Sequence, residues 1–188
     1  MKLLRVWIFV LVALAQLSVP GLMAWGRHQT LKHGRVWKFK TAPIDPEDAV
    51  RVRYVALRFA AESYTGSESD AERIATGTTL YVVLKEDADG FAQVDHVSTT
   101  PLKGDNVVTA KNGYWSNNLQ RVSFPFDQFW VTEKIAPEAE RVYRENSRHG
   151  KENAYVTVHV RNGDAALEQL YIDNQPLADY LRAQAAKK

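Results

Sequence analysis

The chain of 188 residues contains no cysteine. It can therefore form no disulfide, no thiolate metal site and no thiol nucleophile. The part of the chain that follows a long uncharged N-terminal segment also has no excess of charge of either sign. Two of the 24 basic residues, Lys2 and Arg5, precede this segment, and the remaining bases equal the 22 acids in number. Because a domain without an excess of basic residues binds polyanions poorly, we do not expect nucleic acid as a partner.

The sequence also lacks the motifs by which many enzymes and metal sites are recognised. No Gly-x-Ser-x-Gly elbow is present, and Ser123 lies beside Phe124-Pro-Phe126 in a segment with strand character. Of the five histidines only His28 and His33 are close together, and their spacing differs from the spacing of four residues that places two zinc ligands on one helical face. We predict no metal ion and no other cofactor, and we expect a protein without catalytic activity.

The segment Val6–Trp25 contains no charged residue. As a helix, these roughly 20 residues would span about 30 Å, the thickness of a bilayer core. Trp25 lies at the far end, where aromatic residues meet the membrane interface. A retained transmembrane anchor is the preferred interpretation. A signal peptide cleaved near Ala13-Leu14-Ala15 and a buried core helix are the alternatives. We divide the chain into an anchor, residues 1–26, and a domain, residues 27–188.

The charges on either side of this segment give an ambiguous topology. The bases that follow it (Arg27, Lys32, Arg35, Lys38 and Lys40) outnumber those that precede it, which favours a domain inside the cell. Large domains, however, are translocated largely regardless of such charges. We expect a single-pass protein of the bacterial inner membrane whose domain faces the periplasm or the cell exterior.

Alternation of apolar and polar residues predicts a mainly β domain, an antiparallel barrel or sandwich with one or two short helices. Strands are expected over residues 34–41, 51–61, 78–85, 91–97, 107–111, 119–126, 154–161 and 165–172. The 51–61 segment changes phase near Tyr54, which predicts a bulge or burial on both faces. The 78–85 segment is apolar on both faces, which is typical of a central strand.

Turn and helix signals complete this prediction. Asn162-Gly163-Asp164 predicts the tight turn of a hairpin between the last two strands. His159 is then expected on the outer face of its strand. Pro137 suits the first turn of a helix that continues to about Arg148, and a short second helix is expected from Pro176.

One sequence pattern resembles a known family. Pro43-Ile-Asp-Pro-Glu-Asp48, followed by Arg51-Val-Arg-Tyr-Val-Ala-Leu-Arg-Phe59, resembles the GDYXXLXY family of membrane-anchored proteins. That family is named for a Gly-Asp-Tyr-x-x-Leu-x-Tyr strand after a Pro-[Val/Ile]-Asp-Pro-x-Asp turn. The resemblance covers most of residues 10–175, including 129–133 and the 156–172 hairpin. It implies an anchored envelope domain and supplies no reaction.

Within the motif, Tyr54 and Leu57 occupy the family's positions. Val52 and Arg53 replace its Gly and Asp, and Phe59 replaces its last Tyr. Valine does not adopt the positive φ that glycine allows, so the strand is expected to continue straight through this position. Arg53 inverts the charge of the family's aspartate, so any role of that carboxylate is absent here.

The motif contains two acids that have two interpretations. Asp45 and Asp48 lie beside Pro43 and Pro46, where aspartates hydrogen-bond nearby backbone N–H groups and prolines restrict the turn. A structural turn is the preferred interpretation. The alternative is a carboxylate pair for acid–base or metal chemistry, as a hydrolase would use.

Three arginines and several aromatic residues are candidates for contact with a ligand or partner. Arg51 and Arg53 share one strand face and, with Arg58, could bind phosphate or a lipid head group, or could simply be solvated. Tyr114 and Trp115 lie in an Asn- and Gly-rich stretch that reads as an exposed loop, where aromatic side chains mark protein or glycan contacts, or cap the core. The aromatic residues of the 124–130 segment are expected in the core.

We therefore predict a non-enzymatic, membrane-anchored interaction module whose partner is another membrane protein. One alternative is a module that binds an envelope glycan, a lipid head group or a small anion through Arg51, Arg53, Tyr114 and Trp115. Another is a hydrolase built around the two aspartates of the turn.

Overall fold

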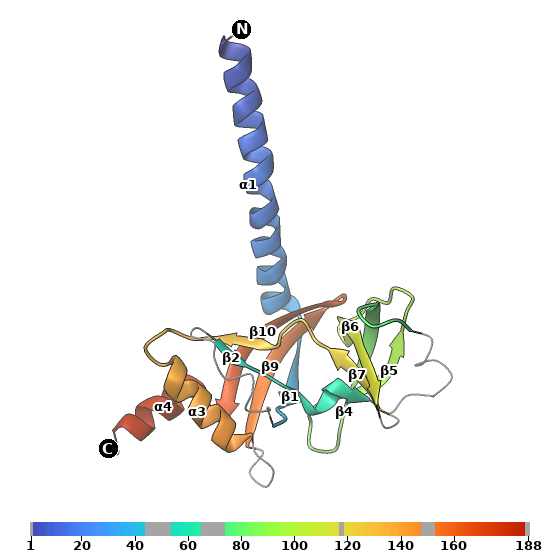
Figure 1. Ribbon diagram of the computed structural model, residues 1–188, viewed down its shortest axis with the longest axis vertical. Helices are drawn as coiled ribbons and strands as arrows, with labels where there is room; N and C mark the ends of the chain where they lie inside the picture. The colour runs from blue at the N-terminus through green and yellow to red at the C-terminus, as the bar shows by residue number, and fades with distance from the viewer. Residues whose placement is uncertain (1, 44–53, 65–73, 117–118, 148–152, 187–188) are drawn as a thin grey trace.

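The computed structural model describes residues 2–43, 54–64, 74–116, 119–147 and 153–186 (Figure 1). A long helix, α1 (Lys2–His33), rises from one side of a strand-rich domain. The described strands of the domain form antiparallel sheets of four, five and two strands. These sheets are open, so the barrel form of the prediction is not realised within the described residues. The mainly β, antiparallel prediction is confirmed.

Most of α1 stands clear of the domain. Its apolar stretch has a mean hydropathy of 2.1, and none of it is buried against the rest of the chain. The interpretation of this segment as a core helix is therefore wrong. By length and composition, α1 can span a membrane. Its last turns contact the domain, and Thr30 is buried there.

The four-stranded sheet follows the order β1-β9-β10-β11. Its strands are β1 (Arg35–Lys40), β9 (Ala154–Arg161), β10 (Asp164–Ile172) and β11 (Gln175–Pro176). Arg161 pairs with Asp164, and Asn162 and Gly163 between them have φ of 52° and 96°. The sequence predicted a tight hairpin turn here, and the two successive positive φ angles are those of a type I′ turn.

β9 is buried on both faces. Val156, Val158 and Val160 face the core, while Thr157 and His159 are buried on the opposite face. The prediction of an outer, exposed His159 is wrong, because the base of α1 contacts β9 and β10 (Figure 1). A strand covered by a sheet on one side and a helix on the other has no solvated face.

The five-stranded sheet follows the order β3-β7-β6-β4-β5. Its strands are β3 (Ser63–Tyr64), β4 (Thr79–Glu86), β5 (Ala92–Ser98), β6 (Val107–Ser116) and β7 (Leu119–Ser123). β4 is an inner strand, as predicted. The two larger sheets meet where the Thr109 N–H donates to the Gly163 carbonyl oxygen at 2.8 Å. This bond ties the tip of the β9–β10 hairpin to β6.

The predicted strand over residues 51–61 is wrong in its second half. Within its described residues, 54–61, the strand is β2 (Tyr54–Ala56), which pairs with β8 (Gln128–Trp130). Phe59 then makes a single bridge to Thr41. The Glu62 N–H donates to the Phe59 carbonyl oxygen at 3.0 Å, which turns the chain into the 3-10 helix η2 (Ala60–Glu62).

Two further helices, α3 (Ala136–Asn146) and α4 (Leu177–Ala185), lie where the sequence predicted them. The core contains a cluster of four phenylalanine rings. Phe39 packs edge-on against Phe59, Phe124 and Phe126, with ring centroids 5.0–5.7 Å apart. Of the aromatic residues expected in the core, Phe124 and Phe126 are buried there, whereas Trp130 is 64% exposed.

Candidate functional site

The described part of the family motif contributes to the core. Leu57 and Phe59 are both 2% exposed, and the Tyr54 ring contacts the Trp130 ring with centroids 5.2 Å apart. Pro43 is exposed. The other predicted motif and contact residues of this region lie outside the described residues, namely Asp45, Pro46, Asp48, Arg51 and Arg53. The turn, hydrolase and anion-site hypotheses for them remain predictions.

Tyr114 and Trp115 belong to a strand. Both lie in β6, and Trp115 pairs with Gln120 of β7. The predicted loop is therefore wrong, because the strand continues well beyond residue 111. The register shifts between Asn112 and Trp115, and Gly113 lies against the Arg121 backbone, where a Cβ would be 2.9 Å from the carbonyl oxygen. Glycine allows the two strands to approach closely at this irregularity.

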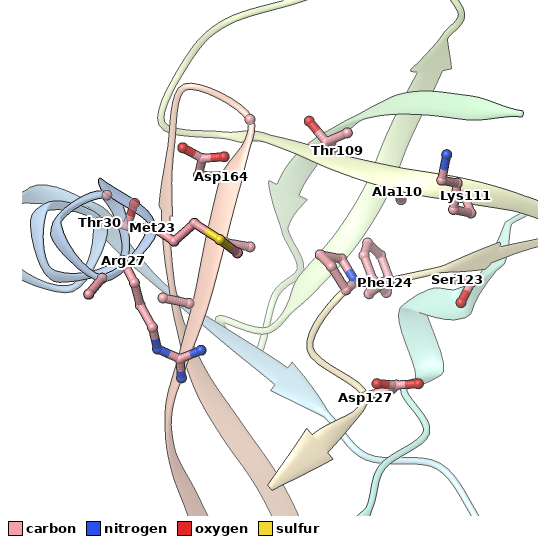
Figure 2. Close-up of a pocket in the computed structure, with 16 residues that line it drawn as sticks. Met23, Arg27, Thr30, Thr109, Ala110, Lys111, Ser123, Phe124, Asp127 and Asp164 are labelled. Atoms are coloured by element: carbon pink, nitrogen blue, oxygen red, sulfur yellow. The ribbon is translucent and has the colours of Figure 1, made fainter. Parts of the chain in front are cut away.

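A groove of about 840 Å³ lies where α1 meets the domain (Figure 2). Four separate segments line this junction groove, as we call it: the base of α1, the middle of β6, the turn after β7 and the tip of the β9–β10 hairpin. Its lining residues are Met23, Ala24, Gly26, Arg27, Thr30, Thr109, Ala110, Lys111, Ser123, Phe124, Pro125, Asp127 and the run Gly163–Ala166. In Figure 2, Met23 extends from α1 toward the hairpin and β6.

The position of the groove depends on Gly34. The chain passes from α1 into β1 through this single residue, whose N–H donates to the Thr30 carbonyl oxygen at 2.8 Å. A Cβ at residue 34 would lie 2.5 Å from the Thr30 carbonyl oxygen and 3.0 Å from that of Val160. Only glycine fits between these backbone atoms. The helix is thus joined to the sheet without a linker, and its direction relative to the domain is fixed.

The groove carries charges of both signs. Arg27, Lys111, Asp127 and Asp164 line it, and each is exposed. The Lys111 Nζ donates to the Thr79 Oγ1 at 2.9 Å. Within the described part of the chain, the side chains of Arg27, Asp127 and Asp164 make no ion pair. The two carboxylates in the groove would repel a phosphate group, so the groove is not suited to phosphate binding. Mixed charges around apolar side chains are typical of protein–protein contacts.

A smaller hollow of about 280 Å³ adjoins the junction groove and shares Ser123 and Asp127 with it. Glu62 lines this hollow and is 6% exposed. Burial raises the pKa of the Glu62 carboxyl group, and the Arg58 guanidinium, 3.5 Å away, opposes that rise. A carboxyl group with a raised pKa is suited to general acid–base catalysis.

Glu62 already has a structural role. Its Oε1 accepts a hydrogen bond from the Phe59 N–H at 3.3 Å, which closes the η2 turn. The Tyr143 hydroxyl accepts a hydrogen bond from the Arg58 N–H at 3.4 Å, and burial raises the pKa of Tyr143 to about 12. These groups hold the segment after β2 against α3. Local hydrogen bonding accounts for this cluster without a substrate.

The sequence did not predict the junction groove. Its walls include segments that are about 80 residues apart along the chain, such as the base of α1 and the middle of β6. The predicted anchor ended at residue 26, so the sequence left residues 27–33 as a connection to the first predicted strand. In the structure α1 continues to His33 and Gly34 alone joins it to β1, which brings the helix end close to the sheet.

A family model described as GDYXXLXY protein matches residues 16–170, which include the second half of α1 and the domain as far as β10. No curated protein and no solved structure matches the chain.

Proposed function

The chain belongs to the GDYXXLXY protein family, and we propose that it is a membrane-anchored, non-enzymatic domain that binds another membrane protein through the junction groove. In this proposal, α1 spans the bacterial inner membrane once. The domain then lies outside the cytoplasm, in the periplasm or at the cell exterior.

The anchor part of the proposal rests on α1. Its large apolar residues are exposed throughout Val6–Trp25, for example Leu14 at 63% and Leu17 at 69%. Exposed leucines on every side of a helix are stable only in an apolar surrounding. Cleavage after Ala15 would leave the apolar run from Leu17 to Trp25 exposed to water. A retained anchor avoids that exposure.

The location of the groove supports a partner in the same membrane. Met23 and Ala24 line the groove and belong to the last apolar turn, while Arg27 is the first charged residue after it. If the apolar run fills the bilayer, the groove opens at the bilayer surface. The single observation that carries the proposal is the junction at Gly34, because a helix fixed to the sheet keeps the groove at this depth.

The experiment is affinity purification of the tagged full-length chain from gently solubilised native membranes, with quantitative mass spectrometry of the proteins that accompany it. Arg27→Glu and Asp164→Lys each invert an exposed groove charge that makes no ion pair within the described residues. We expect a near-stoichiometric membrane protein with the native chain, and at least tenfold less of it with either variant.

The control is Arg182→Glu, which inverts a charge that is 81% exposed on α4, outside the groove. This change also removes the ion pair between Arg182 and Asp179, but a pair so exposed contributes little to stability. This variant should retain the partner, and all three variants should keep the native melting temperature. A native chain that is purified without a membrane protein would contradict the proposal. Equal loss with the groove variants and the α4 variant would show that the groove is not the contact.

A further inference from the structure

We infer that the partner enters the groove as a transmembrane helix that lies along one face of α1. The inferred contact, called the polar face here, comprises Gln16, Pro20, Met23 and Arg27. This inference rests on the proposed function and specifies the chemistry of the partner.

The polar face follows from helix geometry. Residues 16, 20, 23, 27 and 30 are separated by alternate steps of four and three, which place them on one side of a helix. Met23, Arg27 and Thr30 of this series line the junction groove. Gln16 and Pro20 therefore lie on the side of α1 that faces the groove, one to two turns farther into the apolar segment. A helix whose end occupies the groove would pass next to them.

Two polar groups on this face lie in the apolar segment of α1. Pro20 has no backbone N–H, so the carbonyl oxygen of Gln16 has no helical donor four residues on. The Gln16 amide is a second polar group at the same depth, near the middle of Val6–Trp25. Hydrocarbon offers no hydrogen bonds, so polar groups at this depth face other helices rather than lipid.

Ser18, on the opposite side of α1, differs from Gln16 because its side chain has a hydrogen-bond partner within the helix. Its Oγ donates to the carbonyl oxygen of Ala15 at 2.7 Å, so the hydroxyl group is satisfied within the helix. Ser18 therefore needs no partner. The Gln16 amide and the Gln16 carbonyl oxygen, by contrast, lie on the polar face, which is the side of α1 that faces the groove.

The domain disfavours a second copy of this chain as the occupant. It extends to both sides of the base of α1 in Figure 1, and Gly34 leaves no linker between the two. Two identical helices that met along the polar face would bring two broad domains into the same space. A partner helix that ends in the groove requires no such overlap. The expected partner helix carries Asn, Gln, Ser or Thr at mid-depth, which can donate to the Gln16 carbonyl oxygen in place of the N–H that Pro20 lacks.

The test is site-specific photo-crosslinking of the full-length chain in native membranes. Benzoylphenylalanine is placed at Val12 or Val19, which flank the polar face, or at Leu14 or Trp25 on the opposite side. All four side chains are between 49% and 64% exposed. We expect Val12 and Val19 to crosslink to a transmembrane segment of another protein, identified from the crosslinked peptide. Leu14 and Trp25 should crosslink to lipid alone.

Two further variants test the polar groups themselves. Gln16→Leu combined with Pro20→Ala removes the amide and restores the backbone donor to residue 16. We expect the crosslinking yield from Val19 to fall about fivefold, equivalent to about 1 kcal/mol, because interhelical hydrogen bonds in membranes contribute modestly. Ser18→Ala removes a satisfied hydroxyl from the opposite side and should leave the yield unchanged.

A probe at Asp164, on the rim of the groove, separates this inference from the proposed function. If Asp164 crosslinks to a membrane protein while Val12 and Val19 crosslink only to lipid, the groove is the contact and the helical route is wrong. If no position crosslinks to protein, both are wrong. Crosslinks from Val12 or Val19 to a second copy of the chain, or an undiminished yield in the double variant, would also overturn the inference.

Discussion

Replacing Gly34 with alanine tests the fixed junction between α1 and the sheet. The added methyl group would lie 2.5 Å from the Thr30 carbonyl oxygen, 3.0 Å from the Val160 carbonyl oxygen and 3.1 Å from the Val160 nitrogen. All three atoms belong to the backbone, so no side chain can rotate away. The end of the helix or β9 must shift instead. We expect a cost of about 3 kcal/mol, in the upper part of the range for overpacking.

For a domain of this size, such a cost lowers the melting temperature by about 10 °C. Thermal unfolding of the detergent-solubilised full-length chain, followed by near-ultraviolet circular dichroism, measures the change. Gly26→Ala is the matched control, because a Cβ there meets nothing within 4 Å. Alanine in a helix interior should leave stability equal or slightly higher. If Gly34→Ala melts at the same temperature as Gly26→Ala, the junction is not tight and the fixed orientation of the groove is refuted.

Three further predictions concern the core. Burial raises the pKa of Glu62 above 4.5, so the folded state binds the carboxyl proton more tightly than the unfolded state does. The free energy of unfolding should therefore fall as pH rises from 4.5 through the raised pKa. Glu62→Gln should flatten this fall in urea titrations at several pH values, and an unchanged pH dependence of stability would contradict the raised pKa. Tyr143→Phe leaves the Arg58 N–H without its acceptor and should cost about 1–2 kcal/mol in the same titrations, whereas no loss would mean that water replaces the hydroxyl. Phe39→Leu removes three ring contacts and should cost about 2 kcal/mol with the fold retained, by guanidinium denaturation; a cost below about 0.5 kcal/mol would show that the cluster is not tightly packed.

The sequence predicted an element well where the alternation of apolar and polar residues and the turn or helix-start residues indicated the same structure. The β9–β10 hairpin combines strict alternation with Asn162-Gly163, and these residues adopt the two positive φ angles that this turn needs. Likewise α3 begins near Pro137, which fits a first helical turn. In such segments, side-chain pattern and turn chemistry favour the same structure that the tertiary contacts require.

The errors occur where tertiary contacts override local pattern. Tyr114 and Trp115 follow Asn112-Gly113, a loop-like sequence, yet pairing with β7 keeps them in a strand. His159 alternates as a solvent-facing residue but is buried because α1 contacts its strand. The junction groove was missed for a related reason, since its four walls are brought together only by the packing of α1 and the hairpin tip.

The junction groove is expected to lie at the bilayer surface, and the proposed contact with a membrane protein requires this position. The chain has no cysteine, so one cysteine can be placed at Asp164 on the groove rim, or at Arg182 in α4, which lies away from the free end of α1 (Figure 1). Each is labelled with a fluorophore in nanodiscs that contain lipids with nitroxide head groups. Strong quenching at residue 164 and little at residue 182 is the predicted result. Equal quenching at the two positions, or stronger quenching at residue 182, would contradict the account.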